Sequence, residues 1–167
     1  LFAIEPDSTS ANECRQKNIK VLESTSEDAS SWHGKFDVVL SSEVIEHAQD
    51  PYHFISSLYK LNKLGGHTLI TGLGYEGFDI LTLGKESNSV SAPHHLNFLS
   101  IEGFEKLFTK VGYKKVKVWT PGKLDVDIVL NSKYETPFTE AIKRRGQKTI
   151  QEFQDFLTNN KLSSHIW

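Results

Sequence analysis

Short apolar runs alternate along the chain with longer segments in which apolar residues recur at helical spacing. The clearest run covers residues 36–40, FDVVL, and is typical of a strand buried on both faces of a parallel sheet. The polarity changes abruptly after it, to Ser41, Ser42 and Glu43. Ligands of open α/β sheets bind just beyond the carboxyl ends of strands, so these three residues are predicted to face a ligand.

A predicted helix follows this strand. Asp50 and Pro51 have the residue types of an N-cap and a first helical position. Up to about residue 62, one helical face is apolar, with Phe54, Ile55, Leu58 and Leu61. Gly65 and Gly66 are expected to end the helix, and residues 67–71, HTLIT, to form the next strand. Strand, helix and strand together predict a βαβ unit with a right-handed crossover.

The same alternation precedes this unit. Residues 1–4 are expected to form the end of a strand, residues 8–18 a polar helix and residues 19–22 another strand, before a loop at 23–34. This order predicts a Rossmann-like, doubly wound, mostly parallel α/β sheet flanked by helices. With 167 residues, the chain is predicted to be a single domain, residues 1–167.

The second half of the chain is more varied. Gly72, Gly74 and Gly77 match the G-x-G-x-x-G spacing of a dinucleotide fingerprint, but no acid-terminated strand follows about 20 residues later, as that fingerprint requires. Residues 72–92 are therefore interpreted as a flexible glycine-rich connection. The pattern then predicts a helix after Ser100, a strand at 113–119, strand or helix at 124–130, and a helix over 138–161 with a weak point at Gly146.

Composition narrows the classes of partner. The net charge is −2 with 24% charged residues, which indicates no nucleic-acid or membrane-surface partner, and no apolar run is long enough to span a membrane. The single cysteine, Cys14, excludes an internal disulfide and a cysteine-based metal site, and favours a reducing, cytoplasmic location. No pair of histidines has a helical ligand spacing beside a carboxylate, so no metal site is predicted. The oligomeric state stays open.

Glu5 is a second candidate for ligand binding. It directly follows the strand predicted at residues 1–4. In dinucleotide-type folds, an acid at this position accepts hydrogen bonds from ribose hydroxyls. The residues alone also fit a plainer interpretation, in which Glu5 is a solvated loop residue and Pro6 and Asp7 form an ordinary turn.

Four stretches resemble the class I S-adenosylmethionine-dependent methyltransferases, most closely the branch that acts on small molecules and sugars. FDVVLSSEVIEH with its following D-P helix start is similar to the family's fourth-strand motif, KLGGHTLIT to its fifth-strand motif, and PHHLNFLSIEGFEKLFTKVGY to the segment after that strand. The C-terminal stretch FQDFLTNNKLSSHIW also resembles this branch. The resemblance implies an enzyme that transfers a methyl group from S-adenosylmethionine to a small-molecule acceptor, a sugar or another hydroxyl or amine. The reaction would be an in-line displacement that depends mainly on positioning.

The resemblance also implies roles for individual residues. His95, with His94 beside it, would reach into the acceptor pocket, where histidine suits the role of base. Each of these histidines could instead be packed or solvated, and His47 could be a cap. The residues implied in cofactor binding are Glu5 at the ribose, Ser26 and Glu27 beside the adenine, Ser41, Ser42 and Glu43 along the methionine part, and His47, next to Glu46, at the rim.

One feature departs from the family pattern. The family's first strand and its G-x-G-x-G loop have no counterpart here and would lie upstream of Leu1. The sheet is therefore expected to be incomplete at its N-terminal end, with exposed strand edges. Two other functions stay open: a non-catalytic binding module on the same scaffold, and an NAD-type oxidoreductase, in which an acid after the second strand would also bind ribose.

Overall fold

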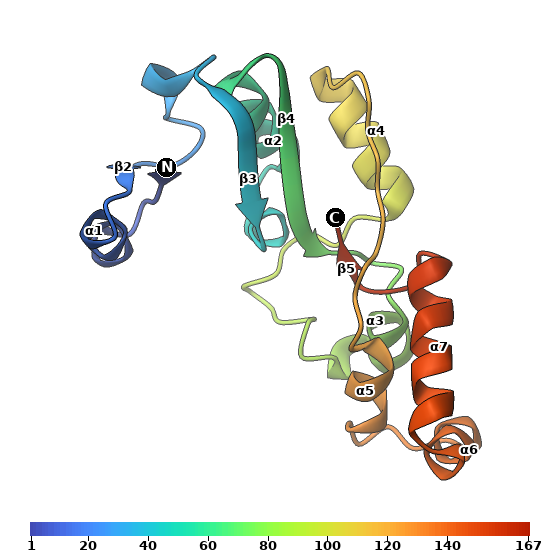
Figure 1. The fold of residues 1–167 in the computed structure, drawn as a ribbon. Helices are drawn as coiled ribbons and strands as arrows, with labels where there is room; N and C mark the ends of the chain where they lie inside the picture. Colours follow the sequence, from blue (N-terminus) through green and yellow to red (C-terminus); the bar gives the residue numbers. More distant parts are fainter.

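Two sheets that are not hydrogen-bonded to each other form the framework of the protein (Figure 1). The structure, a computed structural model, describes residues 1–167. In the smaller sheet, β1 (Phe2–Ile4) runs parallel to β2 (Lys20–Leu22), and α1 (Ser8–Gln16) connects them. Glu5 therefore follows directly at the carboxyl end of β1, as predicted.

The larger sheet contains β3 (Phe36–Ser42), β4 (Asn62–Leu73) and β5 (His165–Ile166). The central strand, β4, is parallel to β3 and antiparallel to β5. Its register with β3 places Ser42 beside Thr71, so the polar ends of the two strands coincide. Mostly parallel strands joined by helical crossovers confirm the predicted α/β class.

The helix α2 (Pro51–Leu61) forms where the sequence predicts it, because its first turn is capped. Asp50 accepts a hydrogen bond from the backbone N–H of His53 at 3.0 Å, and Pro51 occupies the first helical position. A short 3-10 turn, η2 (Ile45–His47), links β3 to this helix. The predicted apolar face of α2 packs in the main core with Val39 and Ile70: Phe54, Ile55, Leu58 and Leu61.

The predicted end of this helix at Gly65 and Gly66 is wrong. The helix ends at Leu61, and β4 begins at Asn62, whose backbone is extended and pairs with Phe36. Both glycines lie inside the strand, where the register with β3 shifts between Phe36 and Val38. Gly65 has φ +80°, which L side chains rarely adopt, so the glycines permit an irregularity in the strand rather than a helix stop.

An aromatic cluster joins the two sheets. Phe2 of β1 lies with its ring centroid 5.5 Å from that of Trp32 in the turn η1 (Ser30–Trp32) and 5.3 Å from that of Phe36 in β3. The rings meet edge to face, and such pairs contribute about 0.5–1.5 kcal/mol each beyond burial. The first residues of β1 and β3 are therefore held together.

Parts of the sheets have no partner within this chain. β1 and β3 each have one strand edge that pairs with nothing. One face of β3 is also open, since Val38 and Leu40 are 63% and 64% exposed, so the predicted burial of this strand on both faces is wrong within this chain. Whether an upstream strand completes the sheet stays a prediction.

The second half of the chain builds a group of helices at one end of the larger sheet (Figure 1). Residues Val126, Leu130, Ile142 and Leu157 form its own small core. None of the helices combines the length and the apolar character that crossing a membrane requires. The helices of this group are α3 (Phe78–Leu83), α5 (Asp125–Leu130), α6 (Pro137–Arg145) and α7 (Gln147–Asn159).

Three sequence predictions need correction in this half. Residues 72–92 are not only a flexible connection, because α3 lies within them and buries Ile80 and Leu83. The helix expected over 138–161 is two helices that separate at Gly146, where φ is +82°. The third correction concerns residues 113–119, which form no strand.

Only the end of the segment 113–119 pairs with another strand. Trp119 and Trp167 exchange two backbone hydrogen bonds of 3.0 and 2.8 Å, in the antiparallel pattern. The preceding residues have no such partner, because β5 contains only two residues. The alternating pattern of this segment therefore reflects its half-buried position and not a ladder. The segment predicted as strand or helix at 124–130 is helical, as α5.

A buried acid pair joins α3 and α5 to the chain before β5. Asp125 accepts hydrogen bonds from Gln154 Nε2 at 2.8 Å and from Ser163 Oγ at 2.6 Å. Asp79 is fully buried, and neither of its carboxylate oxygens has a hydrogen-bond partner. Burial raises the pKa of the Asp79 carboxyl, and the neighbouring charge of Asp125 raises this pKa further.

Asp79→Asn should stabilise the protein at neutral pH. A carboxyl whose pKa is raised by folding contributes stability below its unfolded pKa of about 3.9, and this contribution is lost as the pH rises through the folded pKa. The uncharged amide avoids that loss, so the free energy of unfolding at pH 7 should rise by about 1–3 kcal/mol. Urea unfolding at pH 4 and pH 7 measures it, with the exposed Asp155→Asn as control. A variant less stable than the wild type at pH 7 would contradict this account.

Candidate functional site

Two segments far apart in the sequence are tied together just beyond the carboxyl end of β3. The backbone carbonyl of Glu46, in η2, accepts hydrogen bonds from the amides of Leu96 at 2.7 Å and Asn97 at 3.1 Å. The side-chain amide of Asn97 also donates to the backbone carbonyl of Ala48. These bonds fix the segment at residues 94–97 against η2 and so position the side chains that both segments carry.

Backbone carbonyls orient the two histidines of this site. Nδ1 of His47 lies 2.8 Å from the carbonyl oxygen of His94, and Nδ1 of His95 lies 2.5 Å from that of Ser89. A carbonyl oxygen can only accept, so each Nδ1 carries the proton and each neutral ring keeps its lone pair on Nε2. The ring centroids of His47 and His95 are 4.8 Å apart. The side chain of His94, by contrast, is exposed.

Glu46 completes a three-residue cluster with these histidines. One potential ligand atom from each of Glu46, His47 and His95 lies within 4.8 Å of the other two. Glu46 is only 2% exposed, and its Oε2 has no hydrogen-bond partner. Burial raises the pKa of this carboxyl. A carboxylate beside two imidazoles can bind a cation or accept a proton.

Gly72 of β4 makes room for this carboxylate. A Cβ at this position would lie 2.8 Å from Cγ2 of Ile45 and 3.0 Å from Oε2 of Glu46, which close-packed side chains do not tolerate. The other two glycines of the fingerprint-like spacing are also closely packed, Gly74 against Ile166 and Gly77 against Ser164. The G-x-G-x-x-G spacing thus reflects close packing within the chain.

A second polar cluster lies at the same ends of β3 and β4. Thr71 Oγ1 donates to Glu43 Oε1 at 2.6 Å, so Ser42 Oγ is the donor in its 3.0 Å bond to Thr71 Oγ1. Nδ1 of His165 lies 3.7 Å from the same oxygen of Glu43. Ser41, one residue earlier on the strand, faces the opposite side and is buried. The structure therefore brings Ser42 and Glu43 together and separates Ser41 from them.

The other predicted cofactor residues lie around the smaller sheet. Glu5 accepts a hydrogen bond from the amide of Asp7 at 2.9 Å through Oε1. Ser26 Oγ accepts from Ser57 Oγ of α2 at 2.8 Å and donates to Glu27 Oε2 at 2.9 Å. No hydrogen bond links Glu5, Ser26 or Glu27 to the two clusters at the end of β3.

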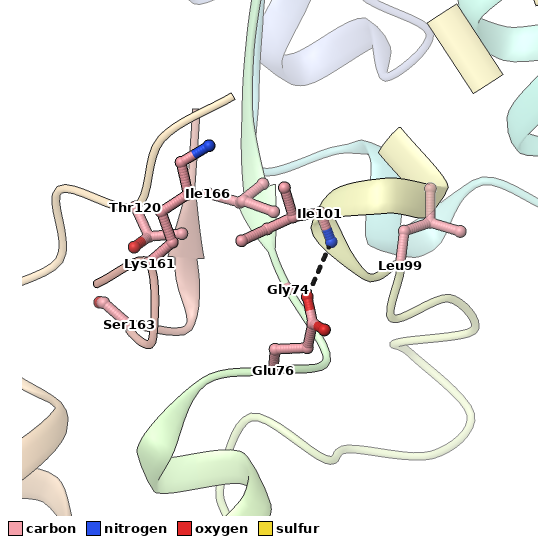
Figure 2. Close-up of a pocket in the computed structure, with 8 residues that line it drawn as sticks. All are labelled: Gly74, Glu76, Leu99, Ile101, Thr120, Lys161, Ser163 and Ile166. Atoms are coloured by element: carbon pink, nitrogen blue, oxygen red, sulfur yellow. Dashed lines mark hydrogen bonds between the residues drawn. The ribbon is translucent and has the colours of Figure 1, made fainter. Parts of the chain in front are cut away.

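A small pocket beside β5 contains none of the predicted site residues (Figure 2). It has essentially no room even for a water molecule, whereas typical ligand sites have roughly 300–1,000 Å³. Glu76 lines it and accepts a hydrogen bond of 2.9 Å from the amide of Ile101, the first residue of α4 (Ile101–Val111). Glu76 therefore serves to hold the start of this helix.

The structure adds to the site several residues that were not predicted to belong to it. Thr71, Gly72 and Asn97 are brought in by β4 and by the segment at 94–97. Glu46 stood only at the rim in the family resemblance. The signal available for it was a carboxylate directly before His47, shortly after the end of the predicted strand.

Comparison with protein families decides the classification. Residues 3–118 match the family model described as "Methyltransferase domain". The chain belongs to this methyltransferase domain family. The matched range contains every predicted site residue from Glu5 to His95 and ends at the buried Val118. Membership in a methyltransferase family argues against the alternative function of an NAD-type oxidoreductase.

Solved structures agree with this family. The protein is similar to a SAM-dependent methyltransferase from Thermotoga maritima, with a TM-score of 0.62 and 25% identity over 71% of this chain and 57% of that one. It is also similar in fold to a SAM-dependent methyltransferase from Archaeoglobus fulgidus, with a TM-score of 0.63 and 17% identity over 99% of this chain and 74% of that one. The chain thus spans little more than half the length of the Thermotoga protein.

A third similar structure contains a bound cofactor. Phosphoethanolamine N-methyltransferase 2 from Haemonchus contortus, in complex with S-adenosyl-L-methionine, has a TM-score of 0.63 and 17% identity over 99% of this chain and 41% of that one. At this identity the likeness concerns the fold. No curated protein sequence matches the chain significantly.

Asn97→Ala should loosen the contact between the 94–97 segment and η2. The substitution leaves the Ala48 carbonyl without its side-chain donor, which costs about 1–3 kcal/mol when the acceptor is buried. Urea unfolding should show a lower free energy of unfolding, and hydrogen exchange should show faster exchange at the Leu96 amide. Asn88→Ala, an exposed asparagine shortly before this segment, is the matched control. Equal stability of the two variants would contradict the role of Asn97.

Proposed function

We propose that this protein transfers a methyl group from S-adenosylmethionine to a small-molecule acceptor with a hydroxyl or amine group. The observation that carries the proposal is the family match over residues 3–118, which includes the carboxyl ends of β1 and β3. Polar groups gather at these ends, where open α/β sheets bind their ligands. The similarity to methyltransferases in fold supports the same reaction class.

The donor set at these strand ends fits parts of the cofactor. The carboxylate of Glu5 is partly exposed, and only its Oε1 is used by the Asp7 amide, so it can accept hydrogen bonds from ribose hydroxyls. Glu27, in the loop after β2, is assigned to the adenine. Ser42 and Glu43 offer hydroxyl and carboxylate oxygens to the methionine part. Ser26 and Ser41 take part through backbone groups, since one hydroxyl is engaged with α2 and the other is buried.

The acceptor side of this site lies at His47 and His95. When bound, S-adenosylmethionine supplies an electrophilic methyl group on a sulfonium. The chain's own residues position the acceptor, which is the main requirement of an in-line displacement. His95 holds a nitrogen lone pair there, because its Nδ1 donates to the Ser89 carbonyl, and such a lone pair can take the acceptor's proton. His94, with its exposed ring, contributes its carbonyl to the orientation of His47.

Glu5→Ala should weaken binding of S-adenosylhomocysteine without unfolding the protein. Losing hydrogen bonds to a charged group costs about 1–3 kcal/mol, which corresponds to roughly a 5- to 150-fold rise in Kd. Isothermal titration calorimetry measures it, with Glu13→Ala, an exposed acid on α1, as the matched control. An unchanged Kd would remove Glu5 from the cofactor site.

Two further measurements separate the enzyme from a non-catalytic module on the same scaffold. The wild-type protein should bind S-adenosylhomocysteine and should transfer label from methyl-labelled S-adenosylmethionine to members of a mixed set of small hydroxyl and amine compounds. Binding without any transfer would favour the binding module. No binding at millimolar ligand would contradict the proposed cofactor.

A further inference from the structure

We propose that Glu46, His47 and His95 bind a divalent transition-metal ion of the Zn²⁺ type. The cluster contains one carboxylate and two imidazoles whose potential ligand atoms all lie within 4.8 Å of one another. This donor set, two histidines and one carboxylate, is one that first-row metals use in sites with open coordination positions. The site stands on its own geometry, whether or not the protein transfers methyl groups.

The hydrogen bonds around the histidines already have the pattern of metal ligands. In metal sites, a ligating imidazole usually donates its other N–H to a backbone carbonyl or a carboxylate, which fixes the tautomer and the ring. Here Nδ1 of His47 donates to the carbonyl of His94, and Nδ1 of His95 donates to that of Ser89. These bonds leave Nε2 of each ring as the nitrogen that can bind an ion.

The carboxylate gives a second and independent indication. Glu46 is 2% exposed, and its Oε2 has no hydrogen-bond partner in the protein. Leaving a buried carboxylate oxygen unpaired is costly, and native proteins rarely do so without a functional reason. The absence of a side chain at Gly72 provides the space in which this oxygen lies. A cation bound beside it would supply the missing partner.

The geometry requires only a small adjustment. Ligand atoms placed about 2.0–2.2 Å from a zinc ion in tetrahedral directions are roughly 3.3 Å apart. The three groups therefore need to approach by at most about 1.5 Å from their separations of up to 4.8 Å. His47 is exposed and His95 is only half-buried, so both side chains can move toward the buried Glu46.

Three protein ligands leave further coordination positions free for an oxygen of a small molecule. The exposed side of His47 opens these positions to solvent. A metal ion there uses the lone pair of His95 that would otherwise accept a proton, so the ion takes over activation of the acceptor. This consequence rests on the proposed methyl transfer, whereas metal binding itself does not.

The test uses the protein without a polyhistidine tag, after removal of metals with EDTA. Equilibrium dialysis against Zn²⁺ should give one bound ion per chain. Bound Co²⁺ should show the visible absorption bands of a low-coordinate site. It should show no thiolate charge-transfer band, and this absence would exclude Cys14 as a ligand. His47→Ala, His95→Ala and Glu46→Gln should each weaken binding by at least about 10-fold. His53→Ala, an exposed histidine on α2, should bind as the wild type does.

The outcomes distinguish the site from general surface binding. Binding of less than a stoichiometric amount of Zn²⁺ and Co²⁺ by the wild type would overturn the proposal, as would equal losses in His53→Ala and His95→Ala. Circular dichroism shows whether each variant is folded. If Glu46→Gln does not fold, the exposed His47 still provides the decisive variant, because its ring can be removed with little loss of packing. Neither the metal-binding measurements nor the circular dichroism depends on methyl transfer.

Discussion

The parallel pairing of β3 with β4 is the interaction on which the rest of the site depends. Its register sets Ser42 beside Thr71, so that the two strands end their polar segments together. A slip of one residue would turn Ser42 to the opposite face and would remove the hydrogen bonds that join Ser42, Thr71 and Glu43. The same register brings Gly72 against Glu46 and so decides where that carboxylate lies.

The acceptor side then depends on a few backbone hydrogen bonds between distant segments. The Glu46 carbonyl binds the amides of Leu96 and Asn97, and the His94 carbonyl binds His47. Each such bond contributes only about 0.5–1.5 kcal/mol, but together they bring His95 to His47 and enclose Glu46. A cluster able to bind a cation or a proton is thus the result of loop docking and not of any local motif.

The structure continues beyond the segment that matches the family model. The family match ends at residue 118, whereas α5, α6 and α7 lie beyond it and form a small core of their own. The buried acids Asp79 and Asp125 connect this core to α3 and to the chain before β5. The predicted site residues all lie within the family match but in two places: Ser42, Glu43 and His95 near the ends of β3 and β4, and Glu5 at the smaller sheet.

Local features of the sequence were sufficient to predict the elements that depend on residues close together along the chain. The strand at Phe36, the cap at Asp50 and the apolar face of α2 follow from residue types within one or two turns. Gly65 misled the prediction, because it lies inside a strand whose pairing with β3 is a long-range contact. Gly146 divides the predicted helix at the weak point that the sequence indicated.

The sequence by itself determined the α/β class, the βαβ unit and the placement of acids and hydroxyls after the strands, because these depend on hydrophobic period and on residues a few positions apart. Only the tertiary structure decided which of these residues meet. It brought His95 to His47 and Glu46 and left Glu5 with the smaller sheet. The reason is that docking of the 94–97 segment and the strand register depend on contacts between residues tens of positions apart, which no local pattern contains.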